Sequence, residues 1–172
     1  MARSTLIGRL RSAASLLLAA GVVLSCQLPL ARPLPGEPLR LSQAAGSGDA
    51  ARRASLRLVL SGLDADAAGR SAEASSLYQR SLQVDATNPY AWLALARQEV
   101  FEGDPERGLS HLDKAEALLA SDPSAAADLA GIRGAGMLAL GQASLAEPFL
   151  REARERAPEF WADGVLDARE LR

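Results

Sequence analysis

Apolar positions along the chain follow two different patterns. Between residues 12 and 31 no side chain is charged. From about residue 50 onward charged and apolar residues are mixed, and alanine and leucine supply most of the apolar positions, since only 4% of the residues are aromatic. Alanine and leucine favour helices, whereas β-branched and aromatic residues favour strands. The pattern therefore predicts an apolar N-terminal segment followed by an all-α domain.

The N-terminal segment has the features of a targeting sequence, because Arg3, Arg9 and Arg11 form a basic head before it. Three fates are compatible with this segment: ordinary signal cleavage, retention as an uncleaved anchor helix, or lipidation and cleavage at Cys26. Ordinary cleavage after residue 31 would need a small residue where Pro29 stands. An anchor helix needs ~20 apolar residues, which the segment just reaches.

Cys26 is the only cysteine in the chain, and it follows the run VLS at residues 23–25. This run resembles the lipobox of bacterial lipoproteins. The resemblance implies that residues 1–25 are removed as a lipoprotein signal peptide and that the Cys26 thiol and the new N-terminus are acylated. Several acyl chains hold a protein on a bilayer far better than one. Gln27, in place of aspartate, resembles sorting to the outer membrane, so the resemblance implies a lipid-anchored protein that faces the periplasm.

Residues 26–48 are predicted to form a tether. Four prolines between residues 29 and 38 break helices and favour extended chain, and the run GSG at residues 46–48 is flexible. The predicted domain therefore begins at Asp49 and covers residues 49–172.

An internal repeat runs through this domain. The segments that begin at Leu58 and Trp92 start 34 residues apart, and Tyr78 of the first corresponds to Leu112 of the second. A step of 38 residues then carries Leu112 to Leu150. The period and residue types resemble the tetratricopeptide repeat (TPR), whose signature is W-x2-L-G-x2-Y, then A-x3-F, then P. The resemblance implies a right-handed α-solenoid of about three helix pairs, with repeats near 55–88, 89–122 and 127–160.

Small residues occupy the positions where the two helices of each predicted pair would cross: Gly62 and Ala74, Ala96 and Gly108, and Gly134 and Ala146. Helix starts are marked independently of the family resemblance. Asn88, Asp104 and Asp122 each precede a proline, and a capping side chain followed by proline at the first helical position is a typical helix start.

The last residues, 161–172, are predicted to form a capping helix. Trp161, Val165 and Ala168 would lie on one apolar face of that helix. Terminal units of a solenoid need such a cover because each unit buries its faces only against its neighbours, and about three units are the minimum for stability.

Charge and reactive side chains favour a binding protein over an enzyme. Removal of residues 1–25 takes three arginines from the 19 basic residues and leaves all 21 acidic ones, a net charge of −5. A basic footprint for nucleic acid is therefore not expected. His111 is the single histidine and is interpreted as a solvated surface residue. No catalytic residue, metal ligand set, phosphate loop, cofactor or small-molecule substrate is predicted.

The resemblance also implies where a partner would bind. In the family, the first helix of each pair lines a concave groove that faces a protein or peptide ligand. A mostly apolar trough with one central arginine would suit an extended or helical peptide. Counted on this sequence, the groove is predicted to contain Tyr90, Leu93, Arg97, Val100 and Phe101 from the middle unit, Leu56, Val59, Leu63 and Asp66 from the first, and Asp128 and Leu138 from the third.

The sequence thus leads to the expectation of a membrane-anchored TPR lipoprotein that acts as a protein-interaction adaptor, or scaffold, in an assembly of the bacterial cell envelope, such as pilus, secretion, outer-membrane or cell-wall machinery. Two alternatives stay open. One is an inner-membrane protein held by the uncleaved N-terminal helix, and the other is a non-catalytic regulatory subunit of an envelope enzyme.

Overall fold

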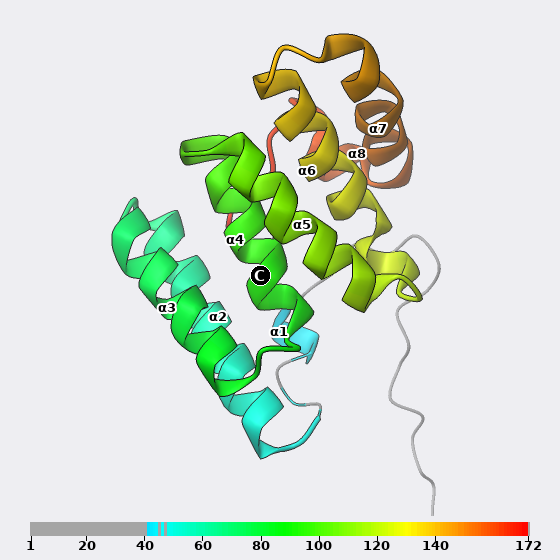
Figure 1. Cartoon of the computed structure of the whole chain (residues 1–172). Helices are drawn as coiled ribbons and strands as arrows, with labels where there is room; N and C mark the ends of the chain where they lie inside the picture. The colour runs from blue at the N-terminus through cyan, green and yellow to red at the C-terminus, as the bar shows by residue number, and fades with distance from the viewer. Residues whose placement is uncertain (1–40, 45, 47, 172) are drawn as a thin grey trace, which may run out of the picture. The chain divides into compact units, whose positions relative to one another are not determined.

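The computed structural model describes residues 41–171 apart from residues 45 and 47. Within this part of the chain every regular element is a helix, so the predicted all-α class is confirmed there (Figure 1). The predicted signal peptide, Cys26 and most of the predicted tether lie outside the described residues. The helices are α1 (Leu41–Ala44), α2 (Ala50–Ala67), α3 (Ser71–Val84), α4 (Pro89–Glu102), α5 (Pro105–Leu119), a 3-10 turn (Pro123–Ala125), α6 (Ala126–Ala139), α7 (Ala143–Arg156) and α8 (Pro158–Trp161).

Consecutive helices pack as pairs, as predicted: α2 with α3, α4 with α5, and α6 with α7 (Figure 1). The predicted caps explain where several helices begin. Asn88 accepts a hydrogen bond from the Tyr90 N–H at 3.1 Å, and Asp104 accepts one from the Arg107 N–H at 3.2 Å. Each side chain satisfies an N–H group that would otherwise lack a partner in the first turn.

Glycines allow close approach within the pairs. A methyl group on Gly62 would lie 2.3 Å from Tyr78 Cε1, and one on Gly134 would lie 2.6 Å from Leu150 Cγ. Both distances are far below van der Waals contact, so any side chain at these positions would push the paired helices apart. The small residues predicted at these helix crossings are confirmed as points of close packing.

The pairs stack through both their first and their second helices. α2 contacts α4, and α4 contacts α6, whereas each second helix packs on the first helix of the next pair, α3 on α4 and α5 on α6. We call α2, α4 and α6 the first-helix layer. α4 lies at the centre of this layer, and its residues 93–100 are all buried. The core of the domain is therefore concentrated around α4.

The predicted capping helix over residues 161–172 is wrong. α8 ends at Trp161, and the residues after it, 162–171, contain turns and no helix. We call residues 162–171 the tail. Gly164 has φ +80°, a left-handed conformation that a continuing helix does not contain. Val165, predicted to lie on the apolar face, is 49% exposed.

Aspartates in the tail replace the helix with local turns. Asp163 accepts a hydrogen bond from the Val165 N–H at 3.0 Å, and Asp167 accepts one from the Arg169 N–H at 2.8 Å. Asp and Asn side chains commonly bind the backbone two residues ahead in this way, in competition with helix hydrogen bonds. The apolar spacing of the tail predicted a helix, but its aspartates and glycine determine a turn-rich segment.

The end of the predicted tether belongs to the folded part. Residues 41–44 form the short helix α1, and Leu41 is fully buried in the same apolar core as Trp161. The Leu41 N–H donates to the Leu171 carbonyl oxygen at 3.3 Å. The described start of the chain is thus joined to its described end.

Candidate functional site: the first-helix layer and its occupant

Most residues of the predicted groove are buried. Leu56, Val59, Leu63 and Leu93 are at most 1% exposed, and Val100 is 7% exposed. Tyr90 and Phe101 are half-buried against the apolar core. Leu138 on α6 is the exception, with 53% of its surface exposed. The first-helix layer is therefore not an empty trough.

The tail crosses the first-helix layer from α6 towards α2. Directly before the tail, at the end of α8, the Trp161 Nε1–H donates to Asp128 of α6 at 3.3 Å. In its middle, the Leu166 carbonyl oxygen accepts from Arg97 Nη1 of α4 at 3.3 Å. Further on, Arg169 Nη2 donates to the Ala67 carbonyl oxygen of α2 at 3.2 Å. In Figure 1 the tail is the red segment after α8, part of which is visible behind α4.

Apolar side chains of the tail are buried in this position. Leu166, Ala168 and Leu171 are 2% exposed or less, and Leu166 and Leu171 belong to the same core cluster as Val59, Leu63 and Leu93 of the predicted groove. A further member of this cluster is Leu41 of α1. The residues predicted to meet a partner are therefore brought together in one core with the chain's own C-terminal segment.

A buried ion pair lies in the centre of the first-helix layer. Arg97 Nη2 of α4 donates to Asp66 Oδ2 of α2 at 2.7 Å, and the Tyr78 hydroxyl donates to the same oxygen at 3.2 Å. Burial raises the pKa of Asp66, and the Arg97 charge opposes this rise. Burial and the nearby Asp66 carboxylate raise the pKa of Tyr78. Arg97 thus connects three parts of the chain: α2 through Asp66, its own helix, and the tail through Leu166.

A second buried carboxyl group, Asp128, lies where α6 meets α8. Its polar contact is the Trp161 indole N–H, and the Trp161 ring packs so closely on Gly131 that a methyl group there would lie 2.2 Å from Cζ2. Burial raises the pKa of Asp128 to about 7, the Trp161 hydrogen bond opposes the rise, and the negative charge of Glu170 adds to it. The pKa of Glu170 is itself raised, first by its partial burial.

A hydroxyl network joins α2, α3 and the cap of α4. Ser55 of α2 donates to the Ser81 carbonyl oxygen and Ser81 of α3 donates to the Ser55 carbonyl oxygen, each at 2.9 Å. The Asn88 side-chain amide donates to Ser55 Oγ at 2.8 Å. All three side chains are fully buried. Buried polar groups cost stability unless they are paired, so this network reads as structural.

Two surface hollows flank the end of α5. One, of about 570 Å³, is lined by residues of α2, α4 and α5 that include Arg52 and Tyr90, and by Asp85 from the connection between α3 and α4. The other, of about 630 Å³, lies between α5, α6 and α7 and is lined in part by Leu129, Arg133 and Phe149. Both mix apolar and charged side chains, and neither contains a converging set of acid, base and nucleophile.

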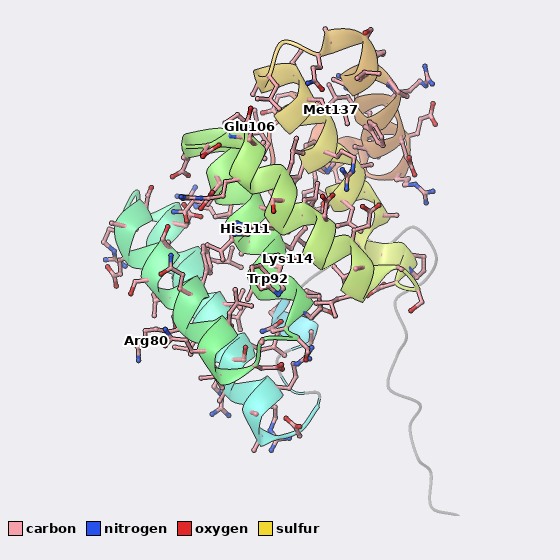
Figure 2. All side chains as sticks on the ribbon, in the orientation of Figure 1. Arg80, Trp92, Glu106, His111, Lys114 and Met137 are labelled. Carbon is pink, nitrogen blue, oxygen red and sulfur yellow. The ribbon has the colours of Figure 1, made fainter. Side chains whose placement is uncertain are left out.

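His111 is less solvated than predicted. Its ring lies 5.4 Å from the Trp92 ring, and Lys114 Nζ lies 4.2 Å from the centre of the same indole. Figure 2 shows these three side chains together, Trp92 from α4 and the other two from α5. Burial lowers the pKa of His111, and Glu99 partly offsets this. Among the described residues, no three histidine, cysteine, aspartate or glutamate side chains gather as a metal site.

The sequence interpretation missed the role of the tail. Trp161 and Ala168 were expected on the apolar face of a capping helix and Glu170 on its polar face, and Leu166 and Leu171 were assigned no role. The available signal was the pair of aspartates, Asp163 and Asp167, which favour turns and so argue against one amphipathic helix.

Comparisons with protein-family models, with curated proteins and with solved structures give no match. In the part of the chain that the structure describes, no helix is both long and apolar enough to cross a membrane. The predicted N-terminal anchor lies outside that part.

Proposed function

We propose that this protein is a bacterial lipoprotein whose TPR-like helix pairs form a right-handed solenoid and act as an adaptor for a protein partner in an assembly of the cell envelope. The proposal combines the residue pattern around Cys26 with the repeat pattern of the helical domain. Its site is the first-helix layer, to which the partner contributes an extended segment.

One observation carries the binding part of the proposal. The first-helix layer already holds a segment without helix or strand, the tail, through buried leucines and through Arg97 bound to a main-chain carbonyl. A main-chain carbonyl is present in every peptide, and apolar side chains at fixed spacing supply selectivity. The layer thus has the chemistry that recognition of an extended segment requires.

Photo-crosslinking tests the adaptor function. A photoreactive amino acid at Leu138 of α6, which is 53% exposed, is compared with one at Leu145 of α7, which is 57% exposed. We expect light to produce a defined crosslinked product with an envelope protein from position 138 only. Equal products from both positions, or none from either, would contradict a partner site on the first-helix layer.

Intact-mass measurement tests the anchor. Protein taken from bacterial membranes should begin at Cys26 and carry acyl chains, and the Cys26→Ala variant should carry none. A mass that still contains residues 1–25 without lipid would instead indicate the uncleaved anchor helix, and the partner should then be sought at the inner membrane.

A further inference from the structure

The tail is held by side chains more than by its backbone. Its main-chain groups bond the rest of the domain through the Leu166 carbonyl to Arg97, through the Leu171 carbonyl to the Leu41 N–H, and through the Gly164 N–H to the Trp161 carbonyl of α8. The remaining attachment comes from the burial of Leu166, Ala168 and Leu171 and from Arg169 on the end of α2. No helix or strand pairing joins the tail to the first-helix layer.

The tail satisfies several of its own N–H groups. The Val165 and Arg169 N–H groups donate to aspartate side chains within the tail, and the Asp167 N–H donates to Glu170 at 2.6 Å. The Glu170 N–H donates to the Asp167 carbonyl at 3.0 Å. Because these bonds are internal, the segment can leave the layer as a unit without breaking them. Release then costs the burial of three apolar side chains and the hydrogen bonds that join the tail to Arg97, to the Ala67 carbonyl and to the Leu41 N–H.

The polar groups beneath the tail are suited to a ligand that binds reversibly. Arg97 keeps Asp66 as a partner when the Leu166 carbonyl leaves, because the two bonds use different guanidinium nitrogens. Its charge is therefore still paired in a layer without the tail. A buried charge that retains its ion pair avoids the large penalty of an unpaired one.

We propose that the tail is a displaceable self-ligand of the first-helix layer, and that an extended partner segment with the same apolar spacing, Leu-x-Ala-x-x-Leu, takes its place. The part of this inference that concerns the partner rests on the proposed function. The displacement of the tail does not. The spacing is that of Leu166, Ala168 and Leu171, three tail side chains that are buried in the core cluster shared with the first-helix layer. Trp161 stays on Gly131 and Asp128 as the hinge end of the segment.

The test uses a fluorescent synthetic peptide of residues 161–172 as the probe. Its binding is measured by anisotropy to the full-length chain and to the Leu166→Ser/Leu171→Ser double variant, whose own tail should be undocked. Val165→Ser is the matched control, because Val165 is 49% exposed beside the buried Leu166. We expect the double variant to bind the probe at least ~10-fold more tightly than the unsubstituted chain and the control, which corresponds to about 1.4 kcal/mol.

Equal binding to all three proteins would overturn the proposal. A probe with serine at positions 166 and 171 should bind none of them, and tight binding of that probe would also overturn it. If circular dichroism shows that the double variant has lost its helices, hydrogen exchange on the unsubstituted chain decides. The Leu41 amide, which donates to the Leu171 carbonyl and loses this partner when the tail leaves, should exchange at least ~10-fold faster than the amides of α4. Exchange at the rate of the α4 amides would show that the tail is a permanent part of the core.

The proposed adaptor function can fail separately. If the probe binds the double variant but Leu138 crosslinks to no envelope protein even in that variant, the self-ligand stands and the adaptor does not. If Leu138 crosslinks a partner while the probe distinguishes none of the variants, the partner binds without displacing the tail.

Discussion

Two buried carboxyl groups at opposite ends of the first-helix layer are stabilised in different ways. Asp66 of α2 lies 2.7 Å from Arg97, with the Tyr78 hydroxyl on the same oxygen, whereas Asp128 on α6 accepts a hydrogen bond from one indole N–H. Burial raises both pKa values, but at Asp66 a full positive charge opposes the effect. The difference teaches that the α2–α4 contact depends on an ion pair, while the contact of α6 with α8 depends on a carboxyl group that is easily kept neutral.

Removal of the Asp66 carboxylate should have the largest effect. Asp66→Ala leaves the Arg97 guanidinium buried, with Glu102 at 3.5 Å as its remaining carboxylate. Breaking a buried pair in this way costs about 3–5 kcal/mol. Urea denaturation of the variant should show a correspondingly lower free energy of unfolding.

Asp113→Ala is the control for this prediction, since Asp113 is also in an ion pair, with Arg133 at 2.9 Å, but its side chain is 66% exposed. Exposed pairs contribute about 0–1 kcal/mol. If the two variants lose the same stability, the buried pair does not hold α2 to α4 as argued here.

The pH dependence of stability should separate the two carboxyl groups. The pKa of Asp128 is raised from 3.8 to about 7 in the folded chain. Its stabilising contribution is therefore complete below pH ~4, where the group is protonated in both states, and is lost as the pH rises to about 7. Over this window we expect Asp128→Asn to gain about 1 kcal/mol per pH unit relative to the unsubstituted chain.

The measurement is urea denaturation of both proteins at several pH values from 4 to 8. Asp128→Asn should match the unsubstituted chain at pH 4 and exceed it at pH 8. A constant difference across the range would mean that Asp128 is ionised in the folded protein, and the contrast with Asp66 would then disappear.

Much of the fold could be predicted because its signals are local. The proline-preceded caps at Asn88 and Asp104 determine where α4 and α5 begin, and the glycines at Gly62 and Gly134 mark where paired helices touch. Each of these features acts within one helix or one pair. They therefore appear in the sequence at fixed spacing, and the repeat makes them visible more than once.

The site could not be predicted in the same way, because it depends on contacts between residues far apart in sequence. The bond from Arg97 to the Leu166 carbonyl spans 69 positions, and the bond from Leu41 to Leu171 joins the two described ends of the chain. The resemblance to the TPR implied that Leu63 and Leu93 face a ligand. Which segment covers them depends on the path of the tail, and no local pattern encodes that path.

The packing at the α6 end gives a smaller predicted effect. Gly131→Ala places a methyl group 2.2 Å from the Trp161 ring, so the indole must move from its position beside Asp128. Overpacking of this kind costs about 1–3 kcal/mol, of which the better helix propensity of alanine returns part. Thermal melting should show a lower midpoint for this variant.

Gly103→Ala is the matched control, because its methyl group would come no closer than 3.8 Å to the Glu99 carbonyl oxygen. Its melting midpoint should stay within experimental error. If Gly131→Ala melts like this control, the Trp161 ring can move on α6 without loss of stability. The contact at Asp128 would then differ from the α2–α4 contact in its looser packing as well as in its lack of an ion pair.

The smallest predicted effect concerns His111, a third group whose burial opposes its charge. Burial is the main cause of its lowered pKa, Glu99 opposes the shift, and Lys114 adds to it. Lys114→Gln should therefore raise the pKa of His111 slightly, and Glu99→Gln should lower it, while burial keeps both values below the ordinary one. Proton NMR titration measures this directly, because the chain has one histidine. A return of the His111 pKa to its ordinary value in Lys114→Gln would show that charge outweighs burial at His111. Burial would then not be the main cause of the pKa shift there, as it is at Asp66 and Asp128.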